Sequence, residues 1–179
     1  RTTEPEEELT LIPMGAARLR ITCFPTVTTG PDGHLWTEPA QPTPATASHS
    51  NQADTIAALS DGVEPRRSRD QRVPRFTWWD RKGSLEWVQY DFPAPRKLSR
   101  ASVYWFSDQP DGGCHAPASW RLLYRVGDEW RPVAATGPYG TDLDRYNTVE
   151  FAPVETAGLR LEAQLQPDFS AGILEWKVE

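Results

Sequence analysis

A regular alternation of apolar and polar residues runs through the second half of the sequence and constrains the fold more than any other feature. Val88, Tyr90 and Phe92 alternate with Gln89 and Asp91, and the same period of two recurs in later segments. Successive side chains of a β-strand point to opposite faces, so this period is typical of half-buried strands. The pattern therefore predicts a chain that is built from strands, with hardly any helix.

The predicted strands are short and regularly spaced. They cover residues 86–92, 101–106, 120–126, 130–133, 147–151, 159–165 and 174–178. Residues 101–106 are apolar on both faces, which favours a central position in the sheet. Gly127-Asp128 supplies a hairpin turn between two of the strands. About eight strands in this arrangement predict an all-β fold, an antiparallel β-sandwich or barrel.

The region before the strands divides into three parts. Residues 1–25 are predicted to form a strand segment from a preceding β-domain, and their opening, Arg1–Glu8, resembles the middle of a protein. We therefore expect the chain to be a fragment of a longer protein. Residues 26–50 are rich in Pro and Thr and are predicted to be a linker or surface wrap. The sandwich is predicted to span residues 51–179 and to begin with a short helix, Asn51–Leu59.

Composition and charge exclude several classes of protein. The 179-residue chain carries a formal net charge of −6, which argues against a nucleic-acid partner bound by phosphate neutralisation. No apolar run approaches the roughly 18 residues that a membrane-spanning helix needs, so no membrane partner is expected. Cys23 and Cys114 form either one disulfide bridge in an exported protein or two separate buried thiols.

The sequence contains none of the familiar catalytic motifs. Nucleophile-elbow, zinc-peptidase, P-loop and dinucleotide-binding patterns are all missing from it. Cys114 and His115 are neighbours, whereas a catalytic Cys–His pair is normally assembled from distant positions. His34 and His49 lie in the Pro-rich stretch, where nothing in the sequence positions them. We therefore expect no catalytic residue of this kind.

Carboxylate pairs of the glycosidase type are harder to exclude, because the chain has 25 acidic residues. Most of them alternate with apolar residues along strands and are predicted to be solvated, as at Glu86, Asp91, Glu150 and Glu162. A small sandwich also lacks the depth to enclose a reacting sugar. The chain is therefore predicted not to be an enzyme.

Three motifs carry a resemblance to a known family. They are Asp61-Gly62, the run Trp87-Val88-Gln89-Tyr90-Asp91-Phe92, and Glu175-Trp176-Lys177-Val178. Their order and spacing resemble the discoidin, or coagulation factor 5/8 type C, family over residues 45–179. Many such domains are carbohydrate-binding modules, similar to family 32, with a galactose-binding-like jelly-roll sandwich. The resemblance implies this fold and a carbohydrate partner.

Four further runs resemble the C-terminal domain of bacterial glycoside hydrolases of the family 127 β-L-arabinofuranosidase type. They are Ala45–His49, Pro74–Asp80, Gly112–Trp120 and Ser170–Trp176. This resemblance implies a parent catalytic domain that the chain does not contain. It also implies a bacterial protein that is secreted or extracytoplasmic, with a cytoplasmic location as the alternative.

Two consecutive tryptophans are the first candidates for contact with a sugar. A protein binds a sugar by placing an aromatic ring against its apolar face and planar polar groups around its hydroxyls. Trp78 and Trp79 precede a strand, and consecutive residues of an extended chain point in opposite directions. At most one of them is therefore expected in the core. The other either covers a loop or serves as the stacking platform.

The polar candidates lie mostly in a loop that contains Gly112 and Gly113. There, Asp108 and His115 are predicted to hydrogen-bond sugar hydroxyls, and the alternative is a solvated loop over a packed Cys114. Further candidates, each equally explained as a turn or edge residue, are Arg75, Tyr146 and Asn147.

The remaining tryptophans are assigned structural roles. Those on strands are predicted to pack mostly in the core, namely Trp87, Trp120, Trp130 and Trp176. Trp36 is predicted to pin the Pro-rich wrap against the sandwich.

The discoidin resemblance further implies a structural calcium ion. Its side-chain ligands would be Asp61 and Glu175, because hard oxygen ligands suit Ca²⁺. The alternatives are an Asp61 that caps a turn and a Glu175 that is an ordinary outward strand residue.

The function predicted from the sequence is non-catalytic. We expect a carbohydrate-binding module that holds a glycoside hydrolase on its glycan or polysaccharide. Two alternatives remain: an accessory domain that packs on the catalytic domain without binding sugar, or one that lends His115 or Asp108 to the active site.

Overall fold

The computed structural model describes residues 28–29, 35–36 and 43–179. The chain divides into two units, residues 1–38 and residues 39–179. In the first unit, β1 (Thr28–Thr29) pairs antiparallel with β2 (Leu35–Trp36). The predicted strand segment 1–25, with Cys23, lies outside the described residues, and so do His34 and the Trp36 side chain.

The second unit is an antiparallel sheet folded over into a sandwich. Its strands are β3 (Ala45–Ala47), β4 (Phe76–Thr77), β5 (Leu85–Phe106), β6 (Ser119–Val126), β7 (Glu129–Pro132), β8 (Tyr146–Gln164) and β9 (Gly172–Val178). They pair in the order β4-β9-β5-β8-β6-β7, and β3 adds to β5. The prediction of an all-β antiparallel sandwich is confirmed.

Two long strands create the two layers. β5 and β8 pair along most of their length, but the register shifts between Asp91 and Arg96 and again between Leu98 and Arg100. Pro93 and Pro95 lie at the first shift, where a residue without an N–H cannot continue the ladder. The first half of β5 therefore pairs with β3 in one layer, and its second half pairs with β9 in the other. Segments that the sequence predicts as separate strands are thus halves of one bent strand.

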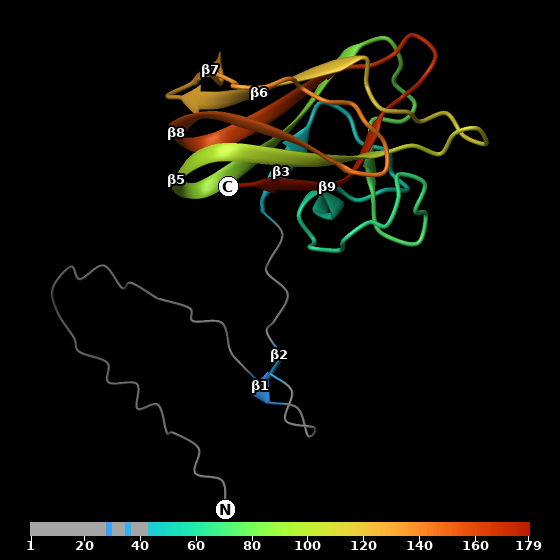
Figure 1. Cartoon of the computed structure of the whole chain (residues 1–179), viewed down its shortest axis with the longest axis horizontal. Coiled ribbons are helices and arrows are strands. Elements are labelled where there is room, and N and C mark those ends of the chain that lie inside the picture. The colour runs from blue at the N-terminus through green and yellow to red at the C-terminus, as the bar shows by residue number, and fades with distance from the viewer. Residues whose placement is uncertain (1–27, 30–34, 37–42) are drawn as a thin grey trace, which may run out of the picture. The chain divides into compact units, whose positions relative to one another are not determined.

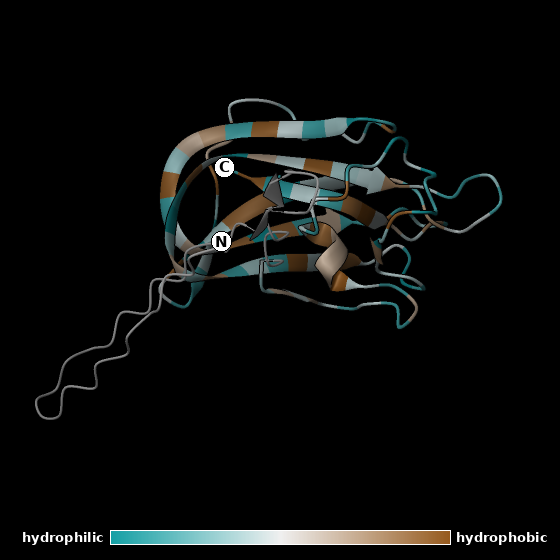
Figure 2. Cartoon of the chain, turned by 90° about the horizontal axis from the view of Figure 1, so that it is seen from below, coloured by the Kyte–Doolittle hydropathy of each residue, from teal (hydrophilic) through white to brown (hydrophobic). Residues whose placement is uncertain are grey.

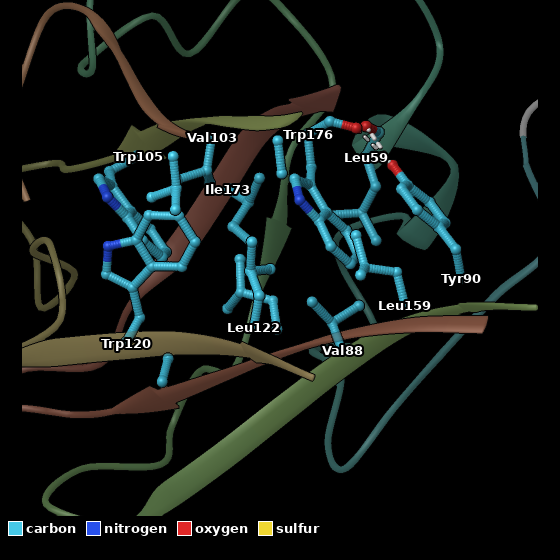
Figure 3. Packing of buried hydrophobic residues seen from close by; sticks show 14 of the residues in the cluster. Leu59, Val88, Tyr90, Val103, Trp105, Trp120, Leu122, Leu159, Ile173 and Trp176 are labelled. Atoms are coloured by element: carbon cyan, nitrogen blue, oxygen red, sulfur yellow. Dashed lines mark hydrogen bonds between the residues drawn. The ribbon is translucent and has the colours of Figure 1, made fainter. Parts of the chain in front are cut away.

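The core lies between the two layers (Figure 3). Val88, Tyr90 and Leu159 face inward from one layer, and Trp105 and Trp176 face inward from the other. The Tyr90 and Trp176 rings stack with their centroids 4.3 Å apart. The Tyr90 hydroxyl lies 2.7 Å from the Leu59 carbonyl and 2.8 Å from that of Trp176, so this buried polar group is satisfied.

The predicted alternation is visible along the strands. Figure 2 shows brown and pale or teal bands following one another, with teal loops at one end of the sandwich. Val88, Tyr90 and Phe92 are buried, as expected. Glu86 is a correction, because it lies on the same inward side of β5 and is buried, whereas the sequence predicts it to be solvated. Its carboxylate accepts hydrogen bonds from Ser48 (2.5 Å) and Ser84 (2.7 Å), which offsets the loss of water.

The tryptophan assignment is half right. Trp120 and Trp176 are buried in the core, but Trp87 and Trp130 are half-buried on the outer face of the layer formed with β6 and β7. The guanidinium carbon of Arg160 lies 4.5 Å from the Trp87 ring centroid and 4.3 Å from that of Trp130. The outer position follows from register, because Trp87 points away from the side that Glu86 and Val88 occupy.

Two predicted boundaries differ from the structure. The sandwich begins before residue 51, because β3 lies in the stretch assigned to the linker or wrap and pairs with Val88 to Tyr90. The helical stretch Asn51–Leu59 is reduced to a single 3₁₀ turn, η1 (Ile56–Leu59), whose start is capped by the Thr55 side chain. No helix in the described residues is long and apolar enough to cross a membrane.

The loops gather at one end of the sandwich. Figure 1 shows them opposite the end where β5 and β8 bend and where the C-terminus lies. The loops after β3, β4 and β5 meet there, since the backbone of Asn51 bonds to Thr77 and that of Thr55 to Arg75. This end of the molecule holds the candidate site.

Candidate functional site

A pocket of about 500 Å³ opens at the loop end of the sandwich. It lies between the loop after β3, the residues around β4 and the loop after β5. The lining residues are Asn51, Asp54, Arg75, Thr77, Trp79, Phe106, Asp108, Asp111, Gly112, Gly113 and Cys114. Three of the seven residues that the sequence predicts to bind a ligand, Arg75, Trp79 and Asp108, are therefore brought together here.

Trp79 forms one wall of the pocket and is 40% exposed. Its ring lies directly against Gly113, where an added Cβ would be 2.3 Å from the ring atom Cζ3. His49 approaches from the loop after β3, with Nε2 2.8 Å from the Trp79 carbonyl. His49 is therefore positioned by a contact across the fold, contrary to the sequence expectation that nothing holds it. The pocket thus contains an accessible aromatic ring on an anchored backbone.

The polar side of the pocket is built around Asp54, whose side chain is buried. Its carboxylate accepts hydrogen bonds from Arg75 Nε (2.9 Å), Thr77 Oγ1 (2.6 Å) and Asn51 Nδ2 (3.1 Å). Three donors account for most of the accepting capacity of the carboxylate, so Asp54 acts as a positioning residue. The Arg75 guanidinium also lies over the Phe106 ring, 4.9 Å from its centroid. Its two terminal nitrogens make no hydrogen bond within residues 43–179.

Asp108 closes the pocket from the loop after β5. Its Oδ1 accepts a hydrogen bond from the Cys114 backbone N–H at 2.8 Å, and its carbonyl accepts one from Gly112 at 3.0 Å. A Cβ on Gly112 would be 2.0 Å from the Asp108 carboxyl carbon, so only glycine allows this close approach. The second oxygen, Oδ2, makes no hydrogen bond within residues 43–179 and is available as an acceptor.

Trp78 and Asn147 are corrections to the predicted site. Trp78 is fully buried, packs edge-on against Phe76 and donates from Nε1 to the Trp87 carbonyl, so its ring is not available to a ligand. Asn147 is buried and holds a turn, with Oδ1 accepting from the Asp142 N–H and Nδ2 donating to the Asp142 carbonyl, both at 2.8 Å. Its polar groups are used within the fold.

His115 and Tyr146 lie away from the pocket lining. His115 Nδ1 is 3.2 Å from Gln166 Nε2, and its ring packs near Phe169. The Tyr146 hydroxyl donates to Glu64 at 2.7 Å, and Lys177 pairs with the same carboxylate. The sequence shows that His115 and Tyr146 lie at or near the ends of predicted strands, but it does not show which way their side chains point.

Five pocket residues are not predicted from the sequence: Asn51, Asp54, Thr77, Phe106 and Asp111. Asn51 and Asp54 lie in the stretch that was assigned to a helix, and only the cross-loop contacts of the fold turn them inward. Phe106 ends a strand that is apolar on both faces, so its position over a pocket is not marked in the pattern.

Cys114 lies beneath the pocket as a buried thiol. Burial, and then the negative charge of Asp108, raises the pKa of this thiol to about 12. The thiol is therefore protonated near neutral pH and is a poor nucleophile.

Asp61 lies just after the η1 turn, and Glu175 lies on β9. Asp61 Oδ1 accepts from the Val63 N–H at 2.8 Å, the local turn bond that the sequence offered as an alternative. Glu175 is only 3% exposed, and its Oε2 has no hydrogen-bond partner within residues 43–179. Burial, and then the negative charge of Asp61, raises the pKa of the Glu175 carboxyl to about 8.

Either a proton or a bound cation would lower the cost of burying this carboxyl. A buried carboxylate oxygen without a partner is costly, and a bound cation would remove that cost. No group of three or more His, Cys, Asp or Glu side chains with metal-ligand placement occurs among the described residues. A hard cation here would therefore take the remaining ligands from backbone carbonyls and water.

The bent β5 and β8 and the two layers that they form give the galactose-binding-like discoidin fold that solved carbohydrate-binding modules share. Comparison with solved structures supports this assignment. No protein-family model matches the sequence.

Three of the similar structures are part of a β-galactosidase, a family 32 carbohydrate-binding module and a chitosan-binding module. One is from the β-galactosidase BgaA of Streptococcus pneumoniae, with a TM-score of 0.68, 23% identity, and coverage of 80% of this chain and 94% of that one. A second is the family 32 carbohydrate-binding module of NanJ from C. perfringens, in complex with galactose. It has a TM-score of 0.60 and 16% identity, and the match covers 78% of this chain and 95% of that one. A third is chitosan-binding module 2 from Paenibacillus sp. IK-5, in complex with chitotriose. It has a TM-score of 0.54 and 15% identity, and the match covers 79% of this chain and 98% of that one.

These similarities concern the fold. The matched binding modules agree with the prediction of a discoidin-like sandwich fold. The narrower resemblance to family 127 enzymes stays a prediction.

Proposed function

We propose that this chain is a non-catalytic carbohydrate-binding module of a larger glycoside hydrolase, and that the loop-end pocket binds its sugar. One observation carries the proposal: the exposed Trp79 ring stands beside Asp108 and Arg75, whose hydrogen-bonding groups are partly unused. An apolar sugar face would stack on the ring, while Asp108 accepts from a hydroxyl and Arg75 donates to a hydroxyl oxygen. The neighbours in complex with galactose and chitotriose support this assignment.

The role of such a module is to raise local concentration. Tethering a catalytic domain to its polymer makes later encounters intramolecular, so even a millimolar affinity for one sugar unit matters in the parent enzyme. The proposal includes an extracytoplasmic location, because the polymer lies there.

The described surface favours this role over that of a purely structural accessory domain. Large exposed hydrophobic side chains within residues 43–179 are Val63, Trp79, Leu85 and Val126. Val126 lies at the β6–β7 hairpin and Leu85 at the start of β5, so they are spread over the molecule. A stable domain–domain contact requires a contiguous apolar patch.

The direct test is affinity electrophoresis in gels containing galactan, arabinan, xylan or chitosan. We expect at least one polymer to retard the wild-type chain and the Trp79→Ala variant to run as in an empty gel. A stacking aromatic at the centre of a site contributes about 2 kcal/mol or more, roughly a 30-fold change in affinity.

The matched control is Trp130→Ala, which removes a half-buried tryptophan from the outer sheet face and leaves the pocket intact. It should keep the retardation of the wild type. Wild-type protein that ignores every polymer, or a Trp79→Ala variant that is retarded normally, would falsify the proposed site.

We also propose that Asp61 and Glu175 hold a structural Ca²⁺ ion, with the unpartnered Glu175 oxygen as the supporting observation. Bound there, the ion would neutralise the buried carboxylate and join the η1 turn region to the last strand. Without calcium, the raised Glu175 pKa (about 8, against 4.5 in the unfolded chain) makes stability fall as pH rises between those two values.

Calcium should reverse this trend, because it binds only the deprotonated carboxylate. We expect the unfolding temperature in EDTA to be higher at about pH 5 than at about pH 8, and the increase caused by excess calcium to be largest at the higher pH. Glu175→Gln should abolish the calcium response, whereas Glu150→Gln, at an exposed strand position, should keep it. Equal unfolding temperatures with calcium and with EDTA at every pH would refute the metal site.

A further inference from the structure

Two more hollows continue from the pocket along the segment that leads into β4. The first has a volume of about 320 Å³ and shares Asp54 and Arg75 with the pocket. The second has a volume of about 340 Å³ and shares Gln71 with the first. Arg69, in the second hollow, pairs with Asp111 of the pocket. Neighbouring hollows thus share lining residues, and we call the three together the arginine path.

Four arginines and four aspartates line the arginine path, namely Arg67, Arg69, Arg72 and Arg75, and Asp54, Asp70, Asp108 and Asp111. Residues 64–75 contain five arginines, namely Arg66, Arg67, Arg69, Arg72 and Arg75, against two acids, Glu64 and Asp70. Three of these arginines have carboxylate partners: Asp111 for Arg69, Asp70 for Arg72 at 3.3 Å, and Asp54 for Arg75 at 2.9 Å. Glu64 is engaged by Lys177 and by Tyr146.

Arg66 and Arg67 are the exceptions. Both are exposed, and neither has a carboxylate within ion-pair distance among residues 43–179. Arg67 lines the second of the two added hollows, and Arg66, its neighbour in the chain, lines none of the three. Uncompensated positive charge therefore lies at this second hollow.

The backbone that carries these arginines is anchored. Ser68 is buried; its N–H donates to Asp144 Oδ1 at 2.7 Å, and its carbonyl accepts from the Ser107 N–H at 3.0 Å. The Asp144 N–H in turn donates to Ser68 Oγ at 2.8 Å. Asp70 is also buried and accepts from the Arg72 N–H at 3.2 Å. Guanidinium groups on a fixed backbone lose less entropy when they bind an anion.

We infer that the ligand is an acidic oligosaccharide, with one sugar on Trp79 and an anionic group farther along its chain at Arg66 and Arg67. The inference rests on the proposed sugar site and specifies its substrate class. Guanidinium groups bind carboxylate and sulfate oxygens by charge-assisted, often bidentate hydrogen bonds. Either anion satisfies this chemistry.

The test uses matched pairs of polymers that differ only in charge. Polygalacturonate is compared with its carboxyl-reduced form, and chondroitin sulfate with its desulfated form, by affinity electrophoresis of the whole chain. We expect the native member of at least one pair to bind about tenfold more tightly than its neutralised form. The first pair reports a carboxylate ligand and the second a sulfate ligand.

The variant is Arg66→Ala/Arg67→Ala, and its control is Arg121→Ala/Arg131→Ala. The control arginines are exposed on the outer face of β6 and β7, away from the path. The first double variant should lose about tenfold in affinity for the native polymer and nothing for the neutralised one. The control double variant should behave as the wild type.

Different outcomes separate this inference from the proposed function. If the neutralised polymer binds as tightly as the native one, and Trp79→Ala abolishes that binding, the sugar site is supported and the inference of an acidic ligand is wrong. Native polymer that binds equally well to Trp79→Ala, or single-stranded DNA that binds as tightly, indicates a non-specific anion patch and overturns both the inference and the role of the pocket. Retention of none of the four polymers also overturns the inference.

Discussion

Tryptophans lie on two surfaces of this domain, and their rings are used differently. At the loop end, the Trp79 ring packs against Gly113, and its other close neighbour is Lys82, 5.7 Å from the ring centroid. On the outer sheet face, Trp87 and Trp130 flank Arg160, which is held by hydrogen bonds of 3.1 and 2.6 Å from its guanidinium to Gln89.

The difference lies in whether the cation is fixed. Lys82 is exposed and makes no ion pair within residues 43–179, so a ligand displaces it at little cost. Arg160 is held by its hydrogen bonds to Gln89, and its guanidinium lies over the rings of both Trp87 and Trp130. A surface tryptophan is therefore available to a sugar only when nothing fixed covers its ring and polar groups stand beside it. The tryptophans on the sheet stabilise the fold, and the tryptophan on the loop is left for a ligand.

Among changes that keep the Trp79 ring, the largest effect is expected from filling the space under it. In Gly113→Ala, the new Cβ would meet ring atoms at 2.3 and 2.8 Å, and the ring is the part that is able to move. We expect sugar affinity to fall at least tenfold, with a stability change within about 1 kcal/mol. Isothermal titration with the retained glycan and urea denaturation measure the two quantities.

Gly137→Ala is the matched control, because a Cβ there meets nothing within 4 Å. It should change neither quantity. Normal affinity in Gly113→Ala would show that the ring position is not what the ligand uses.

An intermediate effect, on the free energy of unfolding and not on glycan binding, is expected from removing the Arg160 guanidinium. Arg160→Ala loses two cation–π contacts and two hydrogen bonds, so the free energy of unfolding should fall by about 1–2 kcal/mol. Arg131→Ala breaks an exposed pair with Glu129 and should cost less than about 0.5 kcal/mol. Both values come from urea denaturation.

The same Arg160→Ala variant also tests the comparison of the two surfaces. It bares the Trp87 ring, while Trp130 keeps Arg125, whose guanidinium carbon lies 5.5 Å from its ring centroid. No hollow described above includes either tryptophan. We expect no new glycan binding. A second binding event in the titration would mean that a bare ring is sufficient without a pocket.

The fold was largely predictable, because it depends on local alternation. Val88, Tyr90 and Phe92 follow the period of two and are buried as expected. The period does not show that β5 and β8 cross from one layer to the other, because the bend near Pro93 and Pro95 resembles a break between separate strands. The same period places Glu86 on the buried side with Val88 and Trp87 on the other side, so these two errors came from expecting charged residues outside and tryptophans inside.

The site was predictable only in part, because it is assembled across loops. Trp79 and Asp108 were found because an aromatic residue and a glycine-bearing loop stand out in the sequence. Asp54 was missed, since its role comes from contacts with Arg75 and Thr77, more than twenty residues away in the chain. Loop partners of this kind depend on how the layers bring the loops together, and no local pattern encodes that.

The smallest effect is expected at His49, which touches the backbone of Trp79 rather than its ring. His49→Ala removes one partly exposed hydrogen bond, with Nε2 2.8 Å from the Trp79 carbonyl, worth about 0.5–1.5 kcal/mol. Because this loss is shared between the fold and the ring position, glycan affinity should fall only about two- to fivefold in isothermal titration. His49→Gln keeps a donor and should recover part of the affinity. A loss as large as that of Trp79→Ala would mean that His49 itself contacts the sugar, whereas no change would mean that Gly113 alone sets the ring position.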